Sequence, residues 1–385
     1  MRKSKSKDLP EEIIEEILWR LPIKTIVRCT SVCRSWYSLI KNPNFISTHL
    51  YRALFSRNNP LFLRPATTDT NPKYKLYFDN KDFGEYMSLN PPFDSKDFFA
   101  VVGSCNGLVC LFGGDSVFSK YRFFLWNPSI RKYLLLPLHQ SISWRHSWEN
   151  YVIGFGFDSK THDYKVLSMR GTFVDNGNHF SAELYSLNAN SWKNISNVAP
   201  KFDGWISHKS YSCSVNDAFH WLAYKMKSIT ETECVIMVFD LRDEVLREMK
   251  LPQCLANSSN LNLNLKVYVC GESSIAVIHQ EDEKNSSIWV MKEYGVVESW
   301  VKLGTVGKRW RGKSRVLGFR CNGDALLHFN RGPGVIASQN IESKRVKNFI
   351  STVRYSDSSV YSYMESLALL DKGADVSANG TSTPK

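Results

Sequence analysis

The sequence predicts a multidomain protein in which a small all-α N-terminal domain of three short helices is followed by an all-β, propeller-like domain. Three observations support this fold class. Apolar residues recur at helical spacing over residues 9–40, where two Leu-Pro steps divide them. From about residue 56 onward, short apolar runs alternate with Gly, Asn and Asp, which is typical of strands and turns. A group of such strands recurs five times, which favours a ring of similar sheets.

The first helix is expected to begin near residue 9. Pro10 suits a first helical turn, because its missing N–H costs little there. Asp8, Glu11 and Glu12 place negative charge at the positive end of the helix dipole. Five apolar residues then recur at helical spacing: Ile13, Ile14, Ile17, Leu18 and Leu21.

Pro22 ends the first helix and opens the second, in which Ile23, Ile26 and Val27 continue the apolar stripe. Thr30 or Ser31 is expected to cap a third helix, which Asn42-Pro43 ends. Four apolar residues share a face of that third helix: Val32, Trp36, Leu39 and Ile40. A fourth helical segment around residues 45–55 connects the domain to the remainder. Three helices this short cannot bury their own apolar surface, so the sequence predicts that a partner covers it.

The five repeated units each contain an inner apolar strand followed by strands joined through polar turns. They comprise residues 106–111, 124–128 and 132–137; 151–157, 164–169, 183–187 and Trp192; 218–222, 235–241 and 245–252; 274–278, 288–291 and 299–303; and 325–329, 335–337 and 345–347. The units recur about every 48 to 60 residues, close to the length of a four-stranded propeller blade. Each blade leaves an apolar face that only its neighbour can cover, so we expect a closed ring. Residues 363–370 are expected to close it, near Asn106 or with strands between residues 75 and 89, and the number of blades stays open.

Several motifs resemble a known family. Leu9-Pro10, Leu21-Pro22, the Ile26-Val27-Arg28 step and the V-C-R-S-W run at residues 32–36 resemble the F-box. In the β part, S-C-N-G-L-V-C at 104–110, L-W-N-P-S at 125–129 and G-F-G-F-D at 154–158 resemble the plant F-box-associated interaction domain, as do D-Y-K-V at 163–166 and the run at 182–192. That family has kelch-like and S-locus members, but this chain lacks the paired glycines of regular kelch blades.

The resemblance implies a substrate-recognition adaptor of a Skp/cullin/F-box ubiquitin ligase. The F-box would bind the Skp-type adaptor and, through it, cullin, while the β domain would bind an unknown target protein. Ten residues are expected to contact the adaptor or to hold the contacting helices: Leu9, Pro10, Ile13, Ile17, Leu21, Pro22, Val27, Val32, Cys33 and Trp36. The expected domains are a disordered basic N-terminus (1–7), the F-box with its linking helix (8–55), the propeller-like domain (56–370) and a disordered tail (371–385).

Composition favours a soluble, intracellular protein. No apolar run is long enough for a membrane span or a signal peptide, so we expect the cytoplasm. The basic run Arg2, Lys3, Lys5 and Lys7 leaves nuclear import as an alternative. The net charge of +12 is too dispersed to indicate nucleic acid as a partner. The nine cysteines form no C-x-x-C pair, and we expect reduced, mostly buried thiols with no metal or cofactor.

Catalytic motifs are weak in this chain. Residues 307–314 fit the phosphate-binding pattern G-x-x-x-x-G-K-S, but the following residues read as a strand and not as the required helix. His220 and His328 lie inside apolar strands and are expected in the core, as are five tryptophans: Trp126, Trp192, Trp221, Trp289 and Trp300. We expect a non-catalytic protein. A propeller-type hydrolase and a basic nucleic-acid-binding protein with a helical accessory module stay open as alternatives.

Overall fold

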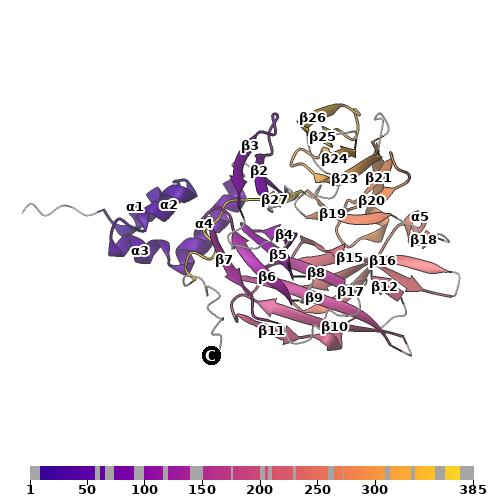
Figure 1. Ribbon diagram of the computed structural model, residues 1–385, viewed down its shortest axis with the longest axis horizontal. Coiled ribbons are helices and arrows are strands. Elements are labelled where there is room, and N and C mark those ends of the chain that lie inside the picture. The colour runs from indigo at the N-terminus through magenta and orange to yellow at the C-terminus, as the bar shows by residue number, and fades with distance from the viewer. Residues whose placement is uncertain are drawn as a thin grey trace, which may run out of the picture.

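An N-terminal group of four helices stands at one side of a β-propeller (Figure 1). The computed structural model describes residues 9–56, 61–65, 73–90, 99–115, 120–138, 151–174, 177–199, 204–206, 210–228, 231–258, 264–271, 273–307, 313–330, 334–351 and 360–372. Within these residues, no helix is both long and apolar enough to cross a membrane. The terminal segment 1–7 and residues 373–385 of the tail, both expected to be disordered, lie outside the described residues.

The helices begin where the Leu-Pro steps predict. They are α1 (Glu11–Trp19), α2 (Ile23–Cys29), α3 (Arg34–Ile40) and α4 (Pro43–Ser56), and Pro10 and Pro22 are the N-cap residues of α1 and α2. The expected cap of the third helix is wrong. Cys33 occupies the N-cap of α3, whereas Thr30 is the C-cap of α2 and donates its hydroxyl to the carbonyl oxygen of Val27 at 2.7 Å. Val32 therefore precedes α3 instead of sharing its face.

Six sheets form the propeller, and they follow one another in chain order. Blade 1 contains β27 (Tyr361–Tyr363), β1 (Leu61–Pro65), β2 (Tyr74–Phe78) and β3 (Glu85–Leu89). Blade 2 contains β4 (Phe99–Cys105), β5 (Leu108–Asp115), β6 (Lys120–Asn127) and β7 (Lys132–Leu135). Blade 3 contains β8 (Tyr151–Asp158), β9 (Asp163–Val174), β10 (Gly177–Ser186) and β11 (Ser191–Asn194), followed by the 3-10 helix η1 (Ser196–Val198).

The remaining blades complete the ring. Blade 4 contains β12 (Gly204–Ile206), β14 (Cys213–Val215), β15 (Ala218–Met226), β16 (Thr232–Asp240), β17 (Val245–Lys250), α5 (Gln253–Ala256) and β18 (Asn257–Ser258). The short strand β13 (Ser210–Tyr211) crosses to pair in parallel with β8 of blade 3. Blade 5 contains β19 (Leu265–Cys270), β20 (Ser274–Gln280), β21 (Ser286–Met291), η2 (Val297–Ser299) and β22 (Trp300–Val306). Blade 6 contains β23 (Lys313–Phe319), β24 (Ala325–Asn330), β25 (Val335–Gln339) and β26 (Val346–Ser351).

The five predicted units coincide with blades 2 to 6. Blade 1 was not predicted as a unit, although strands were expected between residues 75 and 89, where β2 and β3 lie. That blade combines strands from both ends of the β domain, so no repeat of neighbouring strands reveals it. The ring closes where β27 pairs antiparallel with β1, with Leu61 opposite Tyr363. The expected pairing of residues 363–370 was therefore wrong in its partner strand and its length. A separate apolar cluster fills each of the six junctions between blades, including the junction of blade 6 with blade 1.

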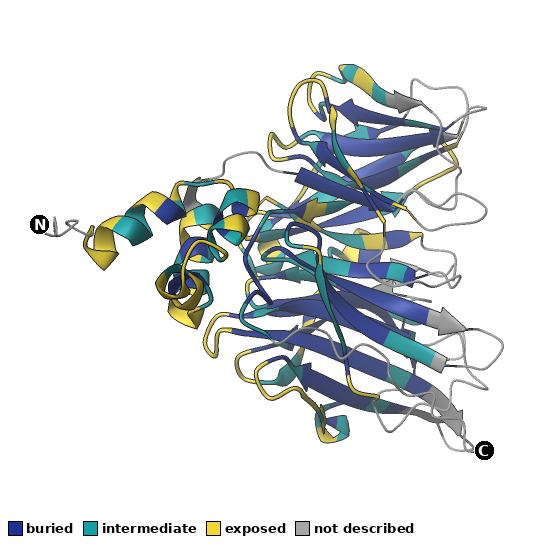
Figure 2. Cartoon of the chain, turned by 60° about the vertical axis from the view of Figure 1, so that its left-hand side comes forward, coloured by how far each residue is buried: buried dark blue, intermediate teal, exposed yellow. Residues whose placement is uncertain are grey.

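The two faces of the propeller differ. Turns such as β4–β5, β6–β7 and β8–β9 share one face, which we call the turn face, and the helices lie on that side (Figure 2). Ile130, in the β6–β7 turn, packs against the helical core. The strands run from this face to the opposite one, which we call the loop face, where β5–β6 and β9–β10 connect.

The expected tryptophans pack in the core, since Trp126 and Trp221 are each 2 % exposed and all five belong to or pack against inter-blade clusters. All nine cysteines are free thiols. The expectation that most are buried was wrong, because only Cys110 and Cys234 are fully buried and Cys33, Cys254 and Cys321 are exposed.

Candidate functional site

The N-terminal helices keep a set of large apolar side chains in contact with solvent. Leu9 is 56 % exposed and Val32 is 63 % exposed. Ile13 and Ile17 are 47 % and 46 % exposed, and their spacing of four residues places them on one face of α1. We call Leu9, Ile13, Ile17 and Val32 the apolar surface of the helices. Exposure of this kind at neighbouring positions is typical of a surface that a partner covers.

The opposite side of the same helices forms a closed core. Leu18, Ile26 and Ile40 have no exposed surface, and Phe45 of α4 is 1 % exposed beside them. Leu21, Val27 and Trp36 are half-buried and pack against this core. Of the ten predicted residues, these three hold the helices together, and the other seven are exposed: Leu9, Pro10, Ile13, Ile17, Pro22, Val32 and Cys33.

Polar contacts fix α1 against α4. Arg52 donates to the Glu16 carboxylate at 2.6 and 3.2 Å, and its guanidinium lies 4.1 Å from the centre of the Trp19 ring. The hydrogen bond from Arg52 holds the pKa of Glu16 below its ordinary value. Trp19 in turn stacks on Phe45 at 5.7 Å. These contacts orient α1 so that Ile13 and Ile17 stay on the outer side.

Cys33 is an exposed thiol at the N-cap of α3. Its sulfur lies 3.1 Å from the Ser35 hydroxyl, and this hydrogen bond lowers the pKa of the thiol. The Cys33 side chain makes no capping hydrogen bond to the backbone of α3, so the exposed thiol stays a candidate for the predicted adaptor surface.

A segment from the far end of the chain completes the helical core, and the sequence missed this role. Leu367 has no exposed surface and Leu370 is 5 % exposed, and both pack among the core residues of α1 to α4. Asn127 holds the segment on blade 2, because its amide donates to the carbonyl oxygens of Ser366 at 3.0 Å and Ala368 at 2.8 Å. Lys132 donates to the carbonyl oxygen of Lys372 at 3.0 Å. We call residues 364–372 the C-terminal clasp.

The C-terminal clasp also explains why residue 107 is a glycine. Gly107 has φ +81°, and a Cβ there would overlap the Ser366 side chain and approach the carbonyl oxygen of Met364. The apolar run at 367–370 was the available signal for the clasp, but such a run does not distinguish a closing strand from an irregular segment buried under helices.

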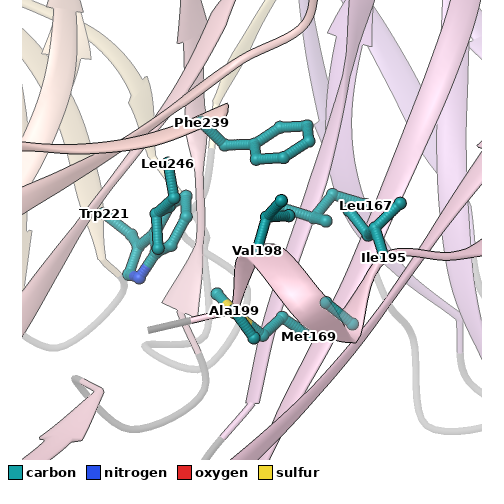
Figure 3. Close-up of a pocket in the computed structure, with 9 residues that line it drawn as sticks. Leu167, Met169, Ile195, Val198, Ala199, Trp221, Phe239 and Leu246 are labelled. Carbon is teal, nitrogen blue, oxygen red and sulfur yellow. The ribbon is translucent and has the colours of Figure 1, made fainter. Parts of the chain in front are cut away.

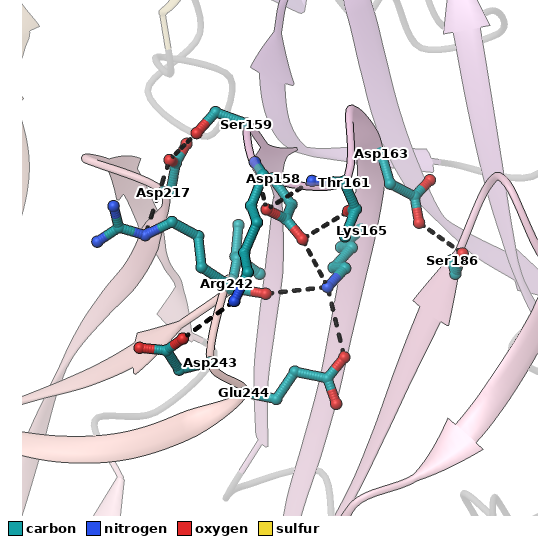
Figure 4. Close-up of polar contacts among 12 residues, drawn as sticks. Asp158, Ser159, Thr161, Asp163, Lys165, Ser186, Asp217, Arg242, Asp243 and Glu244 are labelled. Atoms are coloured by element: carbon teal, nitrogen blue, oxygen red, sulfur yellow. Dashed lines mark hydrogen bonds and ion pairs between the residues drawn. The ribbon is translucent and has the colours of Figure 1, made fainter.

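A buried ion pair lies within blade 3 on the turn face, and its lysine also contacts blade 4 (Figure 4). Lys165 Nζ lies 2.9 Å from Asp158 Oδ2, and it also donates to the carbonyl oxygen of Leu241 at 2.9 Å. Burial raises the pKa of Asp158, but the hydrogen bonds from Thr161 and Lys165 outweigh it and hold the pKa below its ordinary value. The lysine also lies 3.4 Å from Glu244, so its charge is compensated. The network fixes two blades and leaves no poised acid or base.

A pocket between blades 3 and 4 has about 10 Å³ of open volume, room for about one water molecule, and its nine lining residues are all apolar, among them Leu167, Met169, Trp221 and Phe239 (Figure 3). His220 is fully buried with its Nε2 2.6 Å from the Tyr294 hydroxyl, and burial lowers its pKa to about 4. Across the described part of the chain, no group of three His, Cys, Asp or Glu residues is placed to hold a metal ion.

The phosphate-loop pattern begins directly after β22 and ends inside β23. Gly307 follows β22, and β23 begins at Lys313, so a strand follows the pattern as expected. Residues 308–312 lie outside the described residues. A strand supplies no helix N-terminus for a nucleotide phosphate.

Comparison with known proteins gives matches over most of the chain. Residues 7–48 match the model of the F-box domain, and residues 78–367 match the F-box associated beta propeller domain. F-box protein CPR1 of Arabidopsis thaliana is 27 % identical over 315 residues, covering 78 % of this chain and 73 % of that protein. F-box protein At3g07870 of Arabidopsis thaliana is 30 % identical over 328 residues, with the same coverage, and the F-box/kelch-repeat protein At3g23880 of that plant is 29 % identical over 315 residues, covering 77 % and 79 %.

Four helices with an uncovered apolar surface, held on a six-bladed propeller, define a protein of two domains. The chain belongs to the family of F-box proteins that carry an F-box associated beta propeller domain. The resemblance and the fold class expected from the sequence are thereby confirmed.

Proposed function

We propose that this protein is the substrate receptor of a Skp/cullin/F-box ubiquitin ligase. Its helices bind a Skp-type adaptor, and cullin joins through that adaptor. The observation that carries the proposal is the apolar surface of the helices, formed by Leu9, Ile13, Ile17 and Val32. It stays exposed although the same helices and the C-terminal clasp form a closed core behind it. Because these side chains are about half exposed, covering each contributes about 1 kcal/mol before the costs of association.

In this proposal the chain performs no covalent chemistry. Other subunits transfer ubiquitin, and the receptor raises the effective concentration of a target lysine near the loaded enzyme. A fixed geometry between the adaptor-binding helices and the target-binding propeller favours this effect. The C-terminal clasp supports it, because Leu367 and Leu370 enter the helical core while Asn127 holds the same segment on blade 2.

We place target binding on the propeller, with the loop face as the first candidate. Strand ends there point away from the helices (Figure 2), so a bound target would not compete with the adaptor. Recognition commonly resides in loops on a rigid scaffold. The identity of the target is not encoded in a transferable pattern of residues.

The test compares adaptor binding by two charged variants. Ile13→Glu combined with Ile17→Glu should abolish co-purification of the Skp-type adaptor, because the partner would have to bury two carboxylates. Val301→Glu is the matched control, since Val301 is 43 % exposed on β22 of blade 5, and it should bind normally. Equal adaptor recovery with the helical double variant would contradict the proposal.

The same variants test the second half of the proposal. In cells treated with a proteasome inhibitor, target proteins should be recovered with the wild-type chain and with the double variant, since the propeller is intact in both. Without inhibitor, those targets should accumulate only in cells that carry the double variant. Targets whose abundance is the same with both chains would argue against a role in degradation.

A further inference from the structure

Three cationic side chains gather near the loop-face ends of neighbouring strands in blades 5, 6 and 1. Lys266 is the second residue of β19 and Arg315 is the third of β23, and these two first strands lie beside each other. Arg64 is the fourth residue of β1 in blade 1, the blade that packs against blade 6. Arg315 lies directly opposite His328 of β24, and the charges of both Arg64 and Arg315 act on that histidine.

Arg64 is the most unusual of the three. Only 5 % of the residue is exposed, and its Nε atom has no hydrogen-bond partner among the described residues. Arg315 is half-buried and its side chain hydrogen-bonds Tyr268, but among the described residues its Nε atom has no partner. A buried guanidinium without a counter-charge costs several kcal/mol, so the buried Arg64, with the charge of Arg315 acting on the same histidine, favours a bound anion.

The carboxylates on the loop face of blade 5 form ion pairs with other lysines. On the loop face of blade 5, Glu281 pairs with Lys302 at 3.3 Å and Glu283 pairs with Lys313 at 2.5 Å. In the described part of the chain, no ion pair includes Arg64, Lys266 or Arg315. The contrast with Arg320, which is equally buried but lies 2.7 Å from Asp79, shows how this fold compensates a structural arginine.

Lys266 keeps solvent access while many protein atoms surround it, so the cluster can be reached from outside. Burial, and then the charge of Arg315, lower the pKa of Lys266 to about 8. A bound anion would favour the protonated form of Lys266, and the full positive charge of the lysine would then strengthen the binding of the anion.

We propose that Arg64, Lys266 and Arg315 form an anion-binding site that takes a phosphate group. Two guanidinium groups offer planar pairs of donors that match phosphate oxygens, and three cations suit a dianion better than a single carboxylate. The phosphate can be free or carried by a peptide. This inference is independent of adaptor binding, because the site and the helices lie at opposite ends of the strands.

The experiment titrates the full chain with three probes: inorganic phosphate, a short peptide with one phosphoserine, and the same peptide with glutamate in its place. We expect binding of at least one phosphate probe, and binding of the glutamate peptide at least about tenfold weaker. Binding of inorganic phosphate alone assigns the site to free phosphate, and tighter binding of the phosphopeptide assigns it to a carried group. Absence of binding by both phosphate probes, or equal binding of the glutamate peptide, would overturn the proposal.

Variants locate the site. Arg64→Gln and Arg315→Gln should each weaken phosphate binding about tenfold or more, whereas Lys302→Gln removes the same charge from an exposed residue of blade 5 and should leave binding unchanged. Equal weakening by Lys302→Gln would reduce the effect to general electrostatics and refute the site.

Thermal unfolding provides a second readout that does not depend on the affinity of the variants. Phosphate should raise the Tm of the wild type through binding to the folded state, and this rise should vanish in Arg64→Gln. Without phosphate, Arg64→Gln should be at least as stable as the wild type, because it removes an uncompensated buried charge. A large loss of stability in that variant would show that Arg64 has a structural role and would contradict the proposal.

Discussion

Replacing Leu367 by alanine tests whether the C-terminal clasp completes the helical core. Leu367 has no exposed surface and packs with Leu18, Ile26 and Phe45. Truncation of a fully buried leucine costs about 2 to 5 kcal/mol, through lost transfer free energy and the cavity that remains. Because the affected contacts lie in the helical core, we expect the opening free energy of α2 and α3 to fall by this amount. Hydrogen exchange of their backbone amides measures it directly.

Leu369→Ala is the matched control. Leu369 lies two residues along the same clasp and is 4 % exposed, but it packs into the cluster between blades 2 and 3. This variant should reduce protection in β5 and β8 and leave α2 and α3 protected. If Leu367→Ala leaves the exchange of the helices unchanged, or if both variants act on the same elements, the clasp does not stabilise the helical domain.

Three further perturbations follow from the geometry. Gly107→Ala should destabilise the chain in urea unfolding, because the added Cβ would overlap Ser366. Gly295→Ala is the control, since its φ of +86° is similar but its Cβ meets open space, so it should cost only the backbone strain of about 1 kcal/mol. Equal losses of stability in the two variants would contradict this explanation. Lys165→Met leaves a buried carboxylate uncompensated, and we expect a loss of about 3 to 5 kcal/mol by the same measurement, so a loss under about 1 kcal/mol would refute it. Burial lowers the pKa of His220 from 6.5 to about 4, so between those pH values the unfolded chain binds a proton that the folded chain does not. The free energy of unfolding should therefore fall by on the order of 3 kcal/mol as the pH falls through this window. His220→Gln should remove this pH dependence.

The helical domain was predictable because its signals are local. Pro10 and Pro22 restrict their own backbone and cap α1 and α2, and the spacing of Ile13 and Ile17 fixes their common face. The cap of α3 was harder to predict, since Thr30, Ser31 and Cys33 all have side chains that can accept from a helix N-terminus. Only the packing of the whole group decides among them.

The blades were predictable where a hairpin carries its own turn. Blade 1 and the clasp were not predictable, because β27 pairs with β1 across about 300 residues and neither segment carries a local signal that identifies its partner. The role of Leu367 depends on which surface finally covers an apolar run, and that is a property of the closed ring. The cationic cluster was missed for the same reason, since Arg64 and Arg315 become neighbours of His328 only when blade 6 meets blade 1.

The most direct test of the central claim is the affinity of a purified Skp-type adaptor for alanine variants of α1. Ile13 and Ile17 each expose nearly half of their surface, so an adaptor that covers them gains about 1 kcal/mol from each, and the double alanine variant should bind about 30-fold more weakly. Ile14→Ala is the control on the same helix, because Ile14 packs against the core, and it should lower stability with little change in affinity. Calorimetric titration that gives the predicted weakening for the outer pair alone would support the account, and an unchanged affinity of the Ile13 and Ile17 double variant would contradict it.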